Sequence, residues 1–171
     1  MNLSFRTHWS KTMPAHLAGK PTYFVEKIIK GLKIYPNPIN TLLNSYAENI
    51  KIDEYLSIEK FESLTPKLHT IRQDLKDRWQ ASNDIHFIIN ARTKDRFQFA
   101  PIIPCISTQT IEIMYPPMAR FPVILIDGKR ISKAAELTLA DNDGFNCYAD
   151  FTAWFNKDCT SKIIHWTDFK Y

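Results

Sequence analysis

The densest group of reactive side chains in this sequence is a run of eight residues before its midpoint. In order they are Lys67-Leu68-His69-Thr70-Ile71-Arg72-Gln73-Asp74. Pro66 comes directly before the run and disfavours a helix there, so we expect a strand. Side chains alternate along a strand, which places Thr70 and Arg72 on one face and His69 on the other. If the chain turns beside Pro66, Lys67 joins Thr70 and Arg72, and the three line one concave pocket.

Two kinds of chemistry fit these residue types. A threonine hydroxyl becomes a nucleophile once a base takes its proton, and a neutral, partly desolvated lysine is such a base. Thr70 and Lys67 would fill these two roles, a carboxylate would orient the lysine, and Arg72 would stabilise charge on a carbonyl oxygen. Alternatively, Lys67 and Arg72 would contact phosphates without any reaction.

A second polar segment, residues 139–145, carries a candidate acid. It reads Leu-Ala-Asp-Asn-Asp-Gly-Phe, so that Asp143 stands before Gly144. It does not match a calcium loop, because the glutamate that closes such a loop is missing. A buried Lys67 or Arg72 would need a carboxylate, and the candidates are Asp143 or Asp74, with Glu26 in reserve. The alternative for Asp143 is a turn residue before Gly144. The aromatic residues that follow have the spacing of a core-facing helix: Phe151, Trp154 and Phe155.

Together these segments resemble a known family. The pattern Lys-x-x-Thr-Ile-Arg at 67–72 looks like the signature of ASCH domains, which are small β-barrels of the PUA-like superfamily. Residues 139–155 are similar to that family's acidic residue and the short aromatic-faced helix after it. Residues 163–169 look like the last strand of the family. The likeness covers residues 1–32 and 65–171.

The resemblance implies an α+β fold, a small mixed PUA-like β-barrel with flanking helices. It implies a single domain over residues 1–171, with a helical insertion at 34–64 relative to the compact family pattern. Apolar and polar residues alternate, or apolar residues run together, in the segments expected as strands: 3–9, 85–90, 106–115 and 163–169. We expect one helix to begin at Asn37-Pro38 and further helices at 20–32, 53–64, 133–139 and 146–155.

The first expected helix is amphipathic. Phe24, Ile28 and Leu32 are spaced by four residues and form its buried stripe. Gly31, close to the end of the helix, suits a C-cap. The lysines of this segment are expected on its outer side, where they face solvent or, alternatively, contact phosphates; they are Lys20, Lys27, Lys30 and Lys33.

The first function that the resemblance implies is binding. PUA-like folds read RNA, or a modified nucleobase or nucleotide, in a cleft beside the barrel. In this chain Arg72 and His69 would contact the ligand. Trp9 and Trp166 would offer ring faces on which bases stack.

The second implied function is catalytic, and the sequence leaves open which of the two applies. Some small bacterial ASCH proteins are amidohydrolases that remove an acyl group from a modified cytidine. By motif match, the catalytic residues here would be Lys67, Thr70 and Asp143. The chain departs from that pattern, because an aspartate with its shorter reach stands in place of a glutamate. A hydrolase requires these three side chains to converge within hydrogen-bond reach or one water.

Basic residues mark two further candidate surfaces. Arg6 and His8 lie on the polar face of the first expected strand, where they either face water or line a cleft. An expected hairpin tip carries Arg92, Lys94 and Arg96 within five positions. This tip is a candidate nucleic-acid contact, and the alternative is a solvated loop.

Composition and charge limit the partners, cofactors and location that we expect for this chain. A net charge of +4 permits a nucleic-acid partner without demanding one. The three cysteines form no close pair and no metal-binding spacing, so we expect no disulfide framework, no metal, no cofactor and a cytoplasmic location. No apolar stretch approaches the ~20 residues of a membrane helix. The expected partner is RNA or a modified nucleoside, and nothing in the sequence indicates an oligomeric state.

Overall fold

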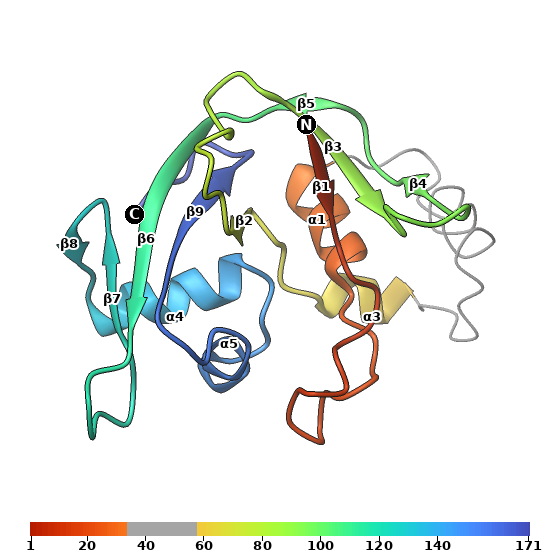
Figure 1. Cartoon of the computed structure of the whole chain (residues 1–171). Coiled ribbons are helices and arrows are strands. Elements are labelled where there is room, and N and C mark those ends of the chain that lie inside the picture. The colour runs from red at the N-terminus through yellow and green to blue at the C-terminus, as the bar shows by residue number, and fades with distance from the viewer. Residues whose placement is uncertain (34–57) are drawn as a thin grey trace.

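The computed structural model describes residues 1–33 and 58–171, which form an α+β protein with two β-sheets (Figure 1). In one sheet β3 (Asp84–Ile89) pairs with β1 (Asn2–Ser4), β4 (Phe97–Gln98) and β5 (Ile103–Pro104). The other sheet has the order β2 (His69–Arg72), β9 (Cys159–His165), β6 (Ser107–Met114), β7 (Val123–Ile126) and β8 (Lys129–Arg130). The helices of the described residues are α1 (Phe24–Leu32), α3 (Ile58–Ser63), α4 (Lys133–Asn142) and α5 (Tyr148–Trp154). The expected α+β class is confirmed.

The two sheets do not close into a barrel within the described part of the chain. They face each other at their edge strands β1 and β2, where the Arg72 side chain donates a hydrogen bond from Nη2 to the carbonyl oxygen of Ser4 over 2.8 Å. They also meet where β5 leads into β6. One continuous hydrophobic core contains side chains from both sheets and from the helices. The sheets therefore share a core but keep separate hydrogen-bond ladders.

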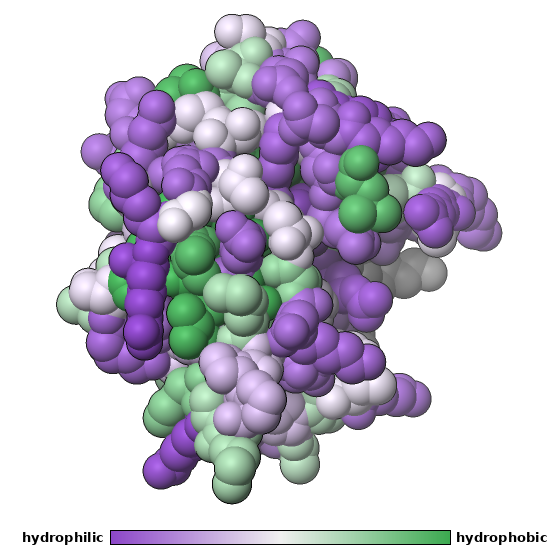
Figure 2. Space-filling model, turned by 60° about the vertical axis from the view of Figure 1, so that its left-hand side comes forward, coloured by the Kyte–Doolittle hydropathy of each residue, from purple (hydrophilic) through white to green (hydrophobic). Residues whose placement is uncertain are grey.

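The sheet around β6 shows the expected alternation. Along β6, Ile111 and Ile113 are buried, whereas Glu112 between them is more exposed. β7 and β8 are joined by Asp127-Gly128, and both residues have positive φ angles, 49° and 75°, as a tight hairpin turn requires. On the face that carries these strands, apolar side chains gather near the centre and polar ones surround them (Figure 2).

Two expected strands have different limits in the structure. The first ends at Ser4 instead of residue 9, because the following residues bond to the segment before α1; for example, the Trp9 N–H donates to the Lys20 carbonyl over 2.9 Å. The last strand is Cys159–His165 instead of 163–169, because the chain bends after His165 and returns towards β6. The strands expected at 85–90 and 106–115 are confirmed to within one residue at each end.

The expected helices are present, with shifted ends. α1 begins at Phe24 instead of residue 20, and α4 runs on to Asn142. α5 lies inside the expected range 146–155. α3 lies inside the expected range 53–64, of which residues 53–57 are outside the described residues, as is the helix expected at Asn37. No helix in residues 1–33 or 58–171 combines the length and the apolar character needed to cross a membrane.

Gly31 has a different role from the one expected. It lies inside α1, and the left-handed cap position is taken by Lys33, with φ 53°. A Cβ atom on Gly31 would overlap the carbonyl oxygen of Lys67. The Lys67 N–H in turn donates to the Lys27 carbonyl of α1 over 2.9 Å. Glycine is required here because the backbone at Lys67 lies directly against the helix.

We expect Gly31→Ala to lower the free energy of unfolding by about 2 kcal/mol, because the added methyl overpacks this contact. Helix propensity alone would raise the free energy of unfolding by about 1 kcal/mol. The sign of the measured change therefore decides between overpacking and helix propensity. Urea unfolding measures it. Gly19→Ala is the control, since no atom lies within 4 Å of its added Cβ and its cost is the strain of a left-handed backbone. A Gly31→Ala protein more stable than the native one would contradict the packing described.

Candidate functional site

A buried ion pair joins the two motifs of the sequence. Lys67 Nζ lies 2.5 Å from Asp143 Oδ1, and the two side chains are 2% and 6% exposed. The same ammonium group also donates to the backbone carbonyl of Asp143. The structure thus brings Lys67 and Asp143 together, in a place that has almost no contact with solvent.

Backbone contacts on both sides position this pair. The Lys67 N–H bonds to α1, and the Leu68 N–H donates to the carbonyl of Asn142, the last residue of α4, over 2.9 Å. Asp143 follows immediately, and Gly144 turns the chain with a φ of 88°. A Cβ on Gly144 would lie 3.1 Å from Cδ of Lys67, so the absence of a side chain leaves room for the lysine.

Asp143 is shared among several groups. Its Oδ1 also accepts a hydrogen bond from the Ile71 N–H over 3.3 Å and lies 3.8 Å from His69 Nδ1. Burial raises the pKa of Asp143 and lowers the pKa of Lys67 to about 8, while their mutual attraction opposes both shifts. An unpaired charge at this depth would be costly, so each group depends on the other.

A second lysine, which the sequence analysis placed on the solvated side of α1, is buried beside the pair. Lys27 Nζ donates to the Gly144 carbonyl and to Asn146 Oδ1, both over 2.7 Å. Burial, together with the nearby charge of Lys67, lowers the pKa of Lys27 to about 8. The expectation of a solvent-facing Lys27 is therefore wrong. Its spacing of three from Phe24 and four from Gly31, both on the packed side of α1, was the signal for this burial.

His69 lies next to the pair and is covered by the end of the chain. Its Nε2 is 2.8 Å from the hydroxyl of Tyr171, which also accepts a hydrogen bond from Asn142 Nδ2 over 3.0 Å. The ring of His165 on β9 stands 5.3 Å away, centre to centre. Burial, followed by the charge of Lys67, lowers the pKa of His69 well below its ordinary value. His69 is thus a neutral, enclosed imidazole. The sequence analysis gave no role to Asn142 or Tyr171.

Thr70 is buried on β2, opposite Ile164 of β9. Within the described residues, no hydrogen bond joins its hydroxyl to Lys67 or to Asp143. The structure therefore joins two members of the expected catalytic group by a hydrogen-bonded ion pair, and among the described residues Thr70 is not hydrogen-bonded to either of them.

Arg72 connects the two sheets through its bond to Ser4. Besides its bond to Ser4, its guanidinium lies 4.9 Å from the centre of the Phe5 ring. Burial lowers the pKa of Arg72, and Asp143 opposes that shift. The side chain is half-buried, so part of it remains in contact with solvent.

The two tryptophans expected to stack on bases belong to the core. Trp9 is 4% exposed and packs edge-on against Phe24, with 5.1 Å between ring centres. Trp166 is 5% exposed and packs in the same way against Phe87 at 5.2 Å. Neither ring presents a free face for stacking in this structure.

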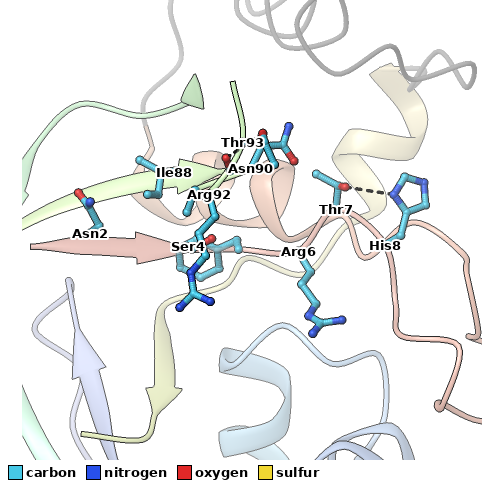
Figure 3. Close-up of a pocket in the computed structure, with 11 residues that line it drawn as sticks. Asn2, Ser4, Arg6, Thr7, His8, Ile88, Asn90, Arg92 and Thr93 are labelled. Carbon is cyan, nitrogen blue, oxygen red and sulfur yellow. Dashed lines mark hydrogen bonds between the residues drawn. The ribbon is translucent and has the colours of Figure 1, made fainter. Parts of the chain in front are cut away.

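An open groove of about 700 Å³ runs along β1 and the end of β3 (Figure 3). Basic side chains line it at Arg6, His8 and Arg92, and the groove lining contains no carboxylate. The remaining lining residues are Asn2, Ser4, Phe5, Thr7, Ile88, Asn90, Ala91 and Thr93. Arg6 and His8 line this groove and are also exposed to solvent.

The expected basic hairpin tip contributes to one wall of this groove. It connects β3 to β4, and Arg92, Lys94 and Arg96 are all exposed on it. Arg92 lines the groove, whereas Lys94 and Arg96 lie outside its lining. Among the described residues, no cluster of three or more His, Cys, Asp or Glu side chains is arranged to hold a metal ion.

We expect Asp143→Asn to lower the free energy of unfolding by about 3 kcal/mol, because it leaves the buried Lys67 without its carboxylate. Adding Lys67→Met to Asp143→Asn removes both charges and should restore much of that loss. Urea unfolding of the two single variants and the double variant measures the coupling between the residues. Strictly additive losses would contradict a direct interaction.

Comparisons with known proteins leave the family of this chain unassigned. No protein-family model matches the sequence, and no curated protein and no solved structure matches it either. The likeness to ASCH domains therefore depends on the residues of the motifs alone.

Proposed function

We propose that this protein is a PUA-like, ASCH-type module that binds RNA or a modified nucleobase or nucleotide. The observation that carries the proposal is the open groove along β1, with basic side chains and no carboxylate in its lining. Such a surface attracts a polyanion and leaves its phosphates accessible to arginine. In this proposal the fold is an open version of the PUA-like barrel, with the bond from Arg72 to Ser4 taking the place of a ladder between β1 and β2.

The chemistry of the buried pair favours binding over catalysis. The Lys67 ammonium group already donates to two oxygens of Asp143 and has almost no exposed surface. A buried ion pair of this kind fixes the position of chain segments, and its charges are satisfied by each other. The groove, by contrast, is open to solvent. We therefore assign recognition to the groove and a structural role to the pair.

We expect a short single-stranded RNA to bind with a Kd on the order of 10⁻⁵ M, and more weakly as salt rises from about 50 to 200 mM. Fluorescence anisotropy measures both quantities. Replacing Lys94 and Arg96 by glutamine should make the slope of log K against log salt shallower by about 1.4, if each contacts one phosphate.

Lys129→Gln with Arg130→Gln is the matched control. It removes the same number of exposed charges from β8, on the opposite side of the molecule from the hairpin tip (Figure 1). The slope of this control should stay close to that of the native protein. If the hairpin variant also keeps the native slope, the tip is not part of the binding surface. If no oligonucleotide binds at low salt, the proposed function is wrong.

A second candidate function is the amidohydrolase. The observation that favours it is the contact between Lys67 and Asp143, together with the lowering of the pKa of Lys67 to about 8 by burial. A lysine with such a pKa is deprotonated in a measurable fraction at neutral pH and can act as a base. The missing bond to Thr70 is the observation against it.

Under the binding proposal, we expect the native protein to release no acetate from cytidine acetylated on its exocyclic amine. Chromatography of the nucleoside after incubation measures this. Turnover that Thr70→Val abolishes, with unfolding and RNA binding unchanged, would establish the hydrolase instead. Turnover that persists in Thr70→Val would point to a contaminating enzyme, and the binding proposal would then stand.

A further inference from the structure

Two arginines enter the groove from segments far apart in the sequence. Arg6 follows β1, and Arg92 belongs to the loop after β3. Figure 3 shows both side chains extending to the same side of β1, with their guanidinium groups beyond the strand. Both residues are exposed. Their charges therefore face the same solvent-filled space.

Neither guanidinium is neutralised by the protein. No ion pair among the described residues includes Arg6 or Arg92. Arg6 lies over the ring of Trp154, 6.0 Å from its centre, a contact that orients the guanidinium without cancelling its charge. Two like charges on one side of a strand repel each other, so an anion between them is favoured.

The wall that carries Arg92 is ordered by its own hydrogen bonds. The Thr93 N–H and hydroxyl donate to the Asn90 carbonyl over 3.0 and 3.1 Å. Asn90 Nδ2 donates to the carbonyl of Asp95 over 3.3 Å. These bonds hold the loop in one shape, so less entropy is lost when a ligand binds.

A third arginine lies behind the floor of the groove. Arg72 bonds to the carbonyl of Ser4 and covers the ring of Phe5, and both of these residues line the groove. Its guanidinium thus contacts two residues of the groove lining without being part of that lining.

The lining suits a phosphate group better than a base. Guanidinium groups bind phosphate oxygens through two parallel N–H bonds, and the neutral side chains of Asn2, Ser4 and Thr7 can bond to phosphate or sugar oxygens. Base recognition in single strands relies on exposed aromatic faces. The aromatic side chains of the lining are Phe5, which is buried, and His8.

We propose that the groove holds the sugar-phosphate backbone of a single nucleic-acid strand, with one phosphate between Arg6 and Arg92. This inference rests on the proposed function and narrows the ligand from a nucleobase to the charged backbone. The groove then recognises the strand through its phosphates and reads little of its base sequence.

The test compares a single-stranded RNA with an oligonucleotide of the same base sequence on an uncharged morpholino backbone. We expect the RNA to bind and the uncharged analogue to show no binding by anisotropy competition. Equal binding of the two would overturn the inference and leave the proposed function standing. Failure of both to bind would overturn the proposed function. Inorganic phosphate, matched to the phosphate content of the RNA, should not displace it; displacement would make free phosphate the ligand and overturn the assignment to a strand.

Substitutions of the two arginines distinguish binding through paired N–H bonds to a phosphate from binding through positive charge alone. Arg6→Lys with Arg92→Lys keeps both charges but removes the paired N–H bonds, so it should weaken RNA binding about tenfold. Arg6→Gln with Arg92→Gln should weaken it further, and the Lys129→Gln, Arg130→Gln control should bind as the native protein does. Native affinity in the lysine variant would overturn the phosphate clamp. Thermal unfolding confirms that each variant is folded, as expected for exposed positions.

Discussion

The rest of the structure depends on the burial of one ion pair. Lys67 and Asp143 are almost without solvent contact, and a charge at that depth is tolerated only with its partner in place. Their contact requires the extended segment at Lys67 to pass between α1 and α4. That path explains Gly31, where a side chain would collide with the Lys67 carbonyl, and Gly144, which packs against the lysine stem. One electrostatic constraint therefore fixes the positions of two helices and one strand.

Other polar side chains are buried around the same ion pair, whereas the arginines of the groove lie at the surface. Lys27 and His69 are buried next to the pair. Lys27 bonds to Gly144 and Asn146, and His69 bonds to the Tyr171 hydroxyl. The arginines behave differently, because a guanidinium stays charged and is satisfied at the protein surface. Part of the accessible positive charge lies along the groove, where Arg6 and Arg92 are exposed. Of the motif that looks catalytic in the sequence, Lys67 is held in a buried ion pair, and Arg72 bonds to Ser4 in the groove lining.

Sequence reasoning succeeded where local rules decide and failed where distant segments meet. Asp127-Gly128 and the alternation of β6 predicted a hairpin and its strand from adjacent residues, and the motif order linked Lys67 to Asp143 before any geometry was known. The burial of Lys27 depends on the loop at Gly144, which comes much later in the chain. Trp9 has the same apolar spacing whether it fills a core or stacks on a base. The groove itself exists because β1 pairs in parallel with β3, and no local pattern encodes that pairing.

The seam between β1 and β2 has a consequence for how the molecule fluctuates. Two strand edges lie opposite each other there, and in the described part of the chain a side-chain bond from Arg72 joins them in place of a ladder. Ladders of backbone bonds open cooperatively, whereas one side-chain bond can break without disturbing its neighbours. The seam can therefore open locally while β1 stays paired with β3 and the long β6–β9 ladder stays intact. Each such opening would expose the Arg72 guanidinium and the ring of Phe5 that it covers, while the backbone bonds of both ladders stay in place.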